Sequence, residues 1–164
     1  MKTLVIVRHA KSSWENPGLS DHQRPLSKRG LKDAPLMGAR LAESGPPVDR
    51  VISSSATRAL TTAELVTHEM GLPWDEIQIE DALYHATEED MIDLINEQDD
   101  YLDGLMLFGH NPGMTYLVND LSDLDLDNLP TSGVAVLQFD VNSWSEIGDG
   151  IALAAEIDYP KKDR

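Results

Sequence analysis

The sequence predicts an α/β domain with a mostly parallel central sheet flanked by helices, and three observations support this. Short apolar runs rich in β-branched residues alternate along the chain with longer segments of helical periodicity. Most of the apolar runs are continuous, which is typical of strands that are buried on both faces of a parallel sheet. The length of 164 residues suits one domain, so we expect residues 1–164 to form a single domain.

The first half of the chain is expected to contain a strand at residues 3–7, a helix at 27–44, a strand at 51–52 and a helix at 56–70. Both strands are short, apolar and β-branched. The first helix ends at Gly45-Pro46-Pro47, and Pro35 inside it predicts a local kink or a lost hydrogen bond. Its apolar residues near helical spacing are Leu31, Ala34, Met37, Leu41 and Ala42. The second helix is closed by Gly71.

The second half is expected to contain a strand at residues 77–79, a helix at 87–97, a strand at 105–108, a helix ending near 121, and strands at 134–139 and 151–157. Thr87 is a suitable N-cap for the first of these helices, and the acidic residues that follow it favour the helix dipole. The strand at 105–108 leads directly into the tight turn Gly109-His110-Asn111-Pro112-Gly113.

Charge is distributed very unevenly along the chain. The net charge is −16, yet residues 1–74 carry +3 and residues 75–164 carry −19. No Lys or Arg occurs from Asp75 to Pro160, so permanent cations for anion binding must come from the first half. In the second half His110 is the candidate cation. The overall charge makes nucleic acid and anionic membranes poor partners, since both would be repelled.

Cysteine is absent, which excludes disulfides, thiolate metal sites and every mechanism with a cysteine nucleophile. This composition suits a reducing cytoplasm, where we expect the protein to reside. The N-terminal apolar run is interrupted by Arg8 and is too short for a signal peptide or a membrane span. The spacing among His22, His68 and His85 does not match a metal site.

Three polar clusters follow apolar strands directly. They are Arg8-His9, the serines 53–55 with Arg58, and Gly109-His110-Asn111. Ligands of open α/β sheets bind at the carboxyl ends of the strands, so we expect the three clusters to converge on one site.

This set of side chains suits a phosphoryl group. A neutral imidazole such as that of His9 can attack phosphorus. Arginines such as Arg8 and Arg58 bind phosphate in a bidentate manner and stabilise its developing charge. Lys11 adds a further cation beside the first cluster.

The motifs, in this order and spacing, resemble those of the histidine phosphatase superfamily, which has the phosphoglycerate-mutase-like fold. The resemblance also rests on Arg24-Pro25-Leu26-Ser27-x-x-Gly30 at the start of the first helix and extends from Lys2 to about Phe139. Among the branches of the superfamily, the chain looks most like the small SixA-type phosphohistidine phosphatases.

The resemblance implies that His9 is the nucleophile and becomes transiently phosphorylated. Arg8, Arg58 and His110 would surround the phosphoryl group, without a metal or other cofactor. The further residues expected to bind substrate are Ser12, Lys11, Arg24 and Asn111. The expected partner is a phosphorylated substrate, such as a signalling protein that carries phosphohistidine.

The proton donor stays open, with Asp21, Glu80, Asp81 and His85 as candidates. Release of an alkoxide requires a well-placed acid, which contributes about 10²–10⁴-fold, whereas phosphohistidine releases imidazole, a much better leaving group. A compact site therefore suits P–N cleavage better than alkyl P–O cleavage. Two alternatives remain: a small-molecule or aryl phosphomonoesterase, and a non-catalytic phosphate-binding module. The sequence does not identify the physiological substrate or the oligomeric state.

Overall fold

A six-stranded sheet forms the centre of the protein in the computed structural model, which describes residues 1–162. Its strands are β1 (Lys2–Arg8), β2 (Arg50–Ser53), β3 (Gln78–Ile79), β4 (Gly104–Gly109), β5 (Val134–Phe139) and β6 (Ala154–Asp158). Their order is β3-β2-β4-β1-β5-β6. The first four strands in this order are parallel, whereas β5 is antiparallel to β1 and β6 to β5. The predicted α/β fold with a mostly parallel sheet is confirmed.

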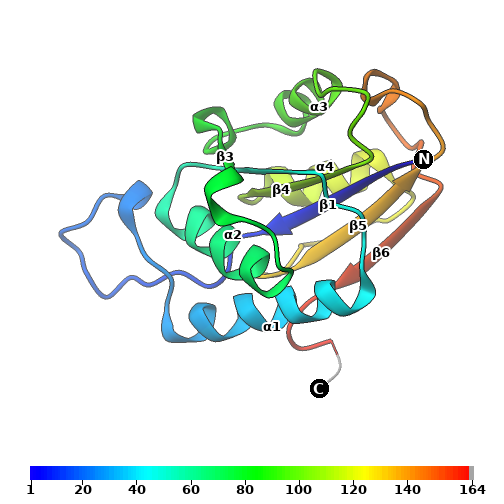
Figure 1. The fold of residues 1–164 in the computed structure, drawn as a ribbon. Helices are drawn as coiled ribbons and strands as arrows, with labels where there is room; N and C mark the ends of the chain where they lie inside the picture. Colours follow the sequence, from blue (N-terminus) through cyan, green and yellow to red (C-terminus); the bar gives the residue numbers. More distant parts are fainter. Residues whose placement is uncertain (163–164) are drawn as a thin grey trace.

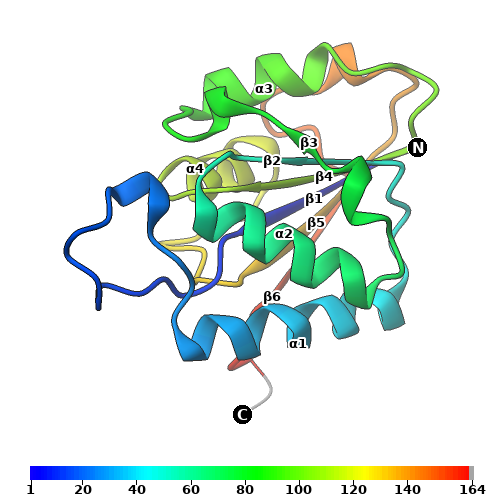
Figure 2. The same ribbon diagram turned by 60° about the vertical axis from the view of Figure 1, so that its left-hand side comes forward.

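Helices cover both faces of the sheet (Figures 1 and 2). They are α1 (Lys28–Ser44), α2 (Thr57–Glu69), α3 (Glu88–Asn96) and α4 (Gly113–Leu121), and the short 3₁₀ turns are η1 (Asp21–Gln23), η2 (Trp74–Glu76), η3 (Asp81–Leu83) and η4 (Trp144–Glu146). Helices α1 and α2 lie on one face, and α3 and α4 on the other. No helix within residues 1–162 is long and apolar enough to cross a membrane.

Strand β1 shows why its sequence is continuously apolar. Leu4 and Ile6 pack in the core that contains α3 and α4, while Val5 and Val7 pack in the core that contains α1 and α2. All four side chains are fully buried. Because full burial of such a side chain contributes about 1.5–3 kcal/mol, a strand between two helical layers needs apolar residues at every position.

Helix α1 begins and ends where the sequence indicates. The Ser27 hydroxyl accepts a hydrogen bond from the Gly30 N–H at 3.2 Å, and Gly45 closes the helix with a left-handed φ of 68°. The helix continues through Pro35, whose nitrogen has no hydrogen to donate. The carbonyl that loses this bond belongs to Leu31, which is 51% exposed and accessible to water.

The buried face of α1 differs in part from the predicted one. Leu31 and Ala42 are exposed, and two glycines lie on the buried face instead. A Cβ at Gly30 would lie 2.2 Å from the Lys11 carbonyl oxygen, and one at Gly38 would lie 2.7 Å from that of Val66. The helix is therefore turned so that its glycines allow close backbone approach.

Candidate active site

The three polar clusters meet at the carboxyl ends of adjacent parallel strands. Arg8 of β1 pairs in register with Gly109 of β4, and the His9 N–H donates to the Gly109 carbonyl at 3.0 Å. On the other side of β4, the Ser54 N–H donates to the Phe108 carbonyl at 3.0 Å. The segment between β1 and α1 projects at this same end of the sheet (Figure 1). The predicted convergence of the clusters is thus seen in the structure.

His9 is held with one ring nitrogen anchored. Its side chain is nearly buried, and Nδ1 lies 2.7 Å from the Ala10 carbonyl oxygen. A carbonyl can only accept, so Nδ1 carries the proton and Nε2 keeps its lone pair. The Ala10 N–H in turn donates to the Thr62 hydroxyl at 2.9 Å, which ties this turn to α2.

The surroundings of His9 favour its neutral form. Burial, together with the positive charges of Arg58, Arg8 and Arg24, lowers the pKa of His9 to about 4 against the opposing effect of the Ala10 carbonyl. His9 is therefore neutral at pH 7. A neutral imidazole with a fixed Nδ1–H and a free Nε2 has the form required of a nucleophile.

A cavity of about 230 Å³ opens beside His9, and we call it the phosphoryl-site cavity. Its lining residues are Arg8, His9, Lys11, Ser12, Trp14, Arg24, Arg58 and Thr131. Four of the eight are permanent cations from the first half of the chain, and none is acidic. The cavity therefore offers a small, positively charged space next to the candidate nucleophile.

The guanidinium group of Arg8 is bound through NH1, whereas its Nε has no hydrogen-bond partner within residues 1–162. Its NH1 donates to the Leu129 carbonyl at 2.9 Å, and burial lowers its pKa. Within residues 1–162, Arg8 Nε, His110 Nδ1 and Ser132 Oγ are buried polar atoms without a hydrogen-bond partner. Buried polar groups are rarely left unpaired in native proteins, and an unpaired one often marks a functional site. The Arg8 Nε–H is thus a donor that an oxyanion would satisfy.

His110 lies next to His9 and is held by a serine. The ring centroids are 5.2 Å apart with an interplanar angle of 52°, and His110 Nε2 lies 2.8 Å from the Ser54 hydroxyl. Burial lowers the pKa of His110 to about 3, with smaller contributions from His9 and Arg58. The expectation that His110 supplies a cation is therefore wrong for the ligand-free protein, in which His110 is neutral at pH 7.

Ser12 contacts another site residue, whereas Asn111 is bound by the loop behind the site. The Ser12 hydroxyl accepts a hydrogen bond from Arg24 NH2. Asn111 Nδ2 donates to the Leu129 carbonyl at 3.1 Å, the same carbonyl that accepts from Arg8. The amide oxygen of Asn111 accepts from the Thr115 hydroxyl at 2.9 Å. This amide therefore holds the loop behind Arg8, and Asn111 does not line the phosphoryl-site cavity.

The candidate proton donors are placed very differently. Asp21 binds Arg24 and Arg58. Its pKa lies well below the usual range, mainly because of the hydrogen bond from the Tyr84 hydroxyl and also because of the two arginines. An ionised Asp21 has no proton to give. At the start of η3, Glu80 is half-buried and Asp81 is exposed, and neither lines the phosphoryl-site cavity. His85 lines a neighbouring cavity of about 260 Å³ together with His110.

Ser54 and Tyr84 make contacts at the site that the sequence does not predict. Ser54 was part of the predicted serine cluster, but its bond to His110 spans 56 positions and has no local signal. Tyr84 packs edge-on against His22 and His110, stacks on His85, and donates its hydroxyl hydrogen bond to Asp21. An isolated tyrosine in a loop belongs to no motif, so only the fold reveals these contacts.

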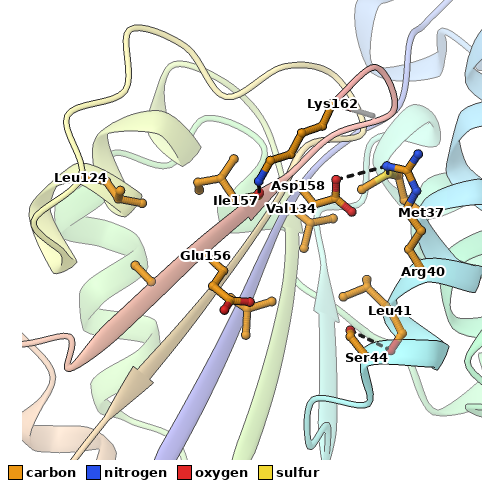
Figure 3. A pocket seen from close by; sticks show the side chains of 12 residues that line it. Met37, Arg40, Leu41, Ser44, Leu124, Val134, Glu156, Ile157, Asp158 and Lys162 are labelled. Atoms are coloured by element: carbon orange, nitrogen blue, oxygen red, sulfur yellow. Dashed lines mark hydrogen bonds and ion pairs between the residues drawn. The ribbon is translucent and has the colours of Figure 1, made fainter. Parts of the chain in front are cut away.

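A larger cavity of about 650 Å³ lies away from His9, along the edge strand β6 and helix α1 (Figure 3). Arg40 and Asp158 form an ion pair of 3.1 Å there, and the predicted site residues do not line it. Within residues 1–162, no group of three or more His, Cys, Asp or Glu side chains is arranged to hold a metal ion.

Comparison with known proteins identifies the family. The model of the histidine phosphatase superfamily (branch 1) matches residues 4–85. An uncharacterized protein of Mycobacterium tuberculosis is 32% identical over 165 residues, which cover 94% of this chain and 100% of that protein. With these matches and the fold, the chain belongs to the histidine phosphatase superfamily.

Solved structures add a likeness to one branch. A candidate phosphohistidine phosphatase SixA from Agrobacterium tumefaciens superposes with a TM-score of 0.77 at 27% identity, covering 94% of this chain and 97% of that one. A protein histidine phosphatase SixA in complex with tungstate has a TM-score of 0.75 at 24% identity, covering 96% and 97%. The chain is therefore SixA-like within its superfamily.

Proposed function

We propose that this protein removes phosphate from phosphohistidine on another protein, through a phosphorylated His9 and without a metal. The observation that carries the proposal is the neutral His9 beside a cavity lined by Arg8, Arg24 and Arg58. Its Nδ1–H is anchored on the Ala10 carbonyl, which leaves Nε2 as the attacking atom. The arginines supply the positive charge that a metal provides in other phosphatases.

Two displacements complete the reaction. In the first, His9 Nε2 forms a bond to phosphorus while the P–N bond of the substrate breaks, and the leaving imidazole takes a proton from solvent. In the second, a water oxygen bonds to phosphorus, the P–Nε2 bond breaks, and phosphate leaves as the water proton passes to solvent. His9 returns to its neutral form with Nδ1 still protonated. The arginines stabilise the charge on the phosphoryl oxygens in both steps.

The absence of an acid from the cavity lining supports this substrate class. Asp21 is held ionised, and Glu80 and Asp81 do not line the cavity. Alkyl ester cleavage would lack the proton donor that contributes about 10²–10⁴-fold, whereas imidazole leaves readily after protonation by solvent.

The size of the cavity and the likeness to SixA add further support. At about 230 Å³ the cavity is smaller than the roughly 300–1,000 Å³ typical of sites that enclose a whole small molecule. It accommodates a phosphoryl group whose carrier remains outside, as on a protein. Two solved structures that resemble this chain are described as phosphohistidine phosphatases or as SixA.

A substrate panel tests the proposal. A phosphohistidine protein, an alkyl phosphomonoester and an aryl phosphate are compared by kcat/KM, with His9→Ala as the control. We expect the phosphohistidine protein to be hydrolysed fastest and His9→Ala to be inactive. Faster turnover of the alkyl or aryl ester would instead favour a phosphomonoesterase, with His85 as the candidate acid. Phosphate binding without any turnover would identify a non-catalytic binding module.

A further inference from the structure

Asp21 connects two of the three arginines that line the phosphoryl-site cavity beside His9. Its Oδ1 accepts from Arg24 NH1 at 3.0 Å, and its Oδ2 accepts from Arg58 NH2 at 3.0 Å. The backbone carbonyl of Asp21 accepts from Arg58 NH1 at 2.7 Å. The Tyr84 hydroxyl also donates to Oδ2. One residue of η1 is therefore bound by three separate parts of the chain.

This carboxylate stands behind the arginines, outside the cavity that they line. Arg24 and Arg58 are among the lining residues, whereas Asp21 is not. Arg24 is held further by the Ser13 carbonyl, which accepts from its Nε at 3.1 Å, and by Trp14, whose ring centroid lies 3.2 Å from the Arg24 Cζ. A carboxylate that occupied the place of the phosphoryl group would lie inside the cavity. Asp21 does not line the cavity and therefore does not take that place.

We infer that Asp21 is a positioning residue of the phosphoryl-transfer site: it fixes Arg24 and Arg58 toward the reacting group, and Tyr84 fixes Asp21. The inference rests on the proposed function for the identity of the reaction. The role itself rests on the contacts just described.

Electrostatics explains why the site needs such a residue. Arg24 and Arg58 repel each other as well as Arg8, and a carboxylate between the first two offsets this repulsion. The side chains of both arginines are 9% exposed and that of Asp21 is 49% exposed, so solvent screens these pairs less than it screens pairs in which both partners are exposed. Fixing the guanidinium groups before the reaction removes a reorganisation step from the transition state.

Asp21→Asn tests the inference, because asparagine has the same shape and lacks the charge. Binding of orthophosphate and of vanadate, which can adopt the five-coordinate geometry of the transition state, is measured by calorimetry. Removal of the negative charge of Asp21 should raise the affinity for any anion, whereas loss of the fixed arginine positions should lower it. Because these two effects offset each other, we expect phosphate affinity to change by less than about threefold. Vanadate affinity should fall by roughly 10–100-fold, as expected when transition-state groups are misplaced.

Three variants complete the design. Asp21→Glu should recover part of the vanadate affinity, and Tyr84→Phe should lower it by a smaller factor than Asp21→Asn. Tyr84→Phe also tests the inference should Asp21→Asn fail to fold. Asp99→Asn is the matched control. Asp99 pairs with Arg50, the first residue of β2, and therefore lies at the amino ends of the strands, whereas the site lies at their carboxyl ends. This control should bind both anions like the wild type.

Two results would overturn the inference. Equal changes in phosphate and vanadate affinity in Asp21→Asn would show that Asp21 does not act on the transition state. Tighter binding of both anions would show that Asp21 competes with the phosphoryl group. Neither measurement uses a phosphohistidine substrate. Failure of the wild type to hydrolyse phosphohistidine would therefore contradict the proposed function and leave the test of Asp21 intact.

Discussion

Replacement of Arg58 by alanine should remove a large part of the transition-state stabilisation. The Arg58 side chain is 9% exposed and lines the phosphoryl-site cavity together with His9, so its charge acts in a largely desolvated environment. Removal of one preorganised donor from such a site costs about 10²–10³-fold in kcat, or about 2.7–4 kcal/mol. We expect Arg58→Ala to lose kcat/KM in this range, mostly through kcat.

The assay is steady-state hydrolysis of a phosphohistidine protein, with urea unfolding of each variant to establish that it folds. Asp21 keeps its bonds to Arg24 and Tyr84 in Arg58→Ala, so the variant should retain its fold. Arg50→Ala is the control, because Arg50 binds Gln98 at the amino end of β2, whereas the site lies at the carboxyl ends of the strands. A folded Arg58→Ala within about fivefold of the wild type would refute the electrostatic role of Arg58.

The remaining predictions concern the two imidazoles. Because burial and three arginines lower the pKa of His9 to about 4, its neutral form should predominate from pH 7 downward and should be half lost near pH 4. NMR titration of the ring measures this, and a midpoint above pH 6 would contradict the described environment. Ser54→Ala removes the hydroxyl 2.8 Å from His110 Nε2. It should lower kcat by about tenfold, the equivalent of one hydrogen bond, with KM nearly unchanged. An unchanged kcat would exclude a role for this bond. His110→Ala should cost on the order of 10²-fold in kcat, and full activity would remove His110 from the mechanism.

The fold followed from the sequence where burial leaves a clear pattern. Strand β1 is apolar at successive positions because helices cover both of its faces, and the stop after α1 is a glycine with positive φ. The edge strands were harder to delimit. Strand β3 has only two residues, both exposed, and β6 begins at Ala154, after the predicted start. Exposed edge residues are not selected for apolarity, so their limits are weakly encoded.

The sequence predicts that residues at the carboxyl ends of the strands lie close together, and the structure shows this arrangement for three of them. Arg8, His9 and His110 occupy such positions, and parallel strands bring them together. The contacts made by Asp21 and Tyr84 could not be predicted in this way, because they join segments 63 positions apart. The sequence offers Asp21 as a candidate proton donor, whereas its surroundings in the structure keep it ionised.

The charge distribution also has a clear structural meaning. The cavity beside His9 takes all of its permanent cations from the first half of the chain, although the whole protein carries −16. Such a small positive region within a negative surface admits a single phosphoryl group and discourages polyanions.

The most direct test of the account is to trap the phosphorylated enzyme. Reaction with a radiolabelled phosphohistidine protein is stopped within milliseconds, and the labelled peptide is identified by mass spectrometry. The account predicts an acid-labile, base-stable label on His9, and neither label nor turnover in His9→Ala. Label on another residue, or full turnover by a folded His9→Ala variant, would contradict it.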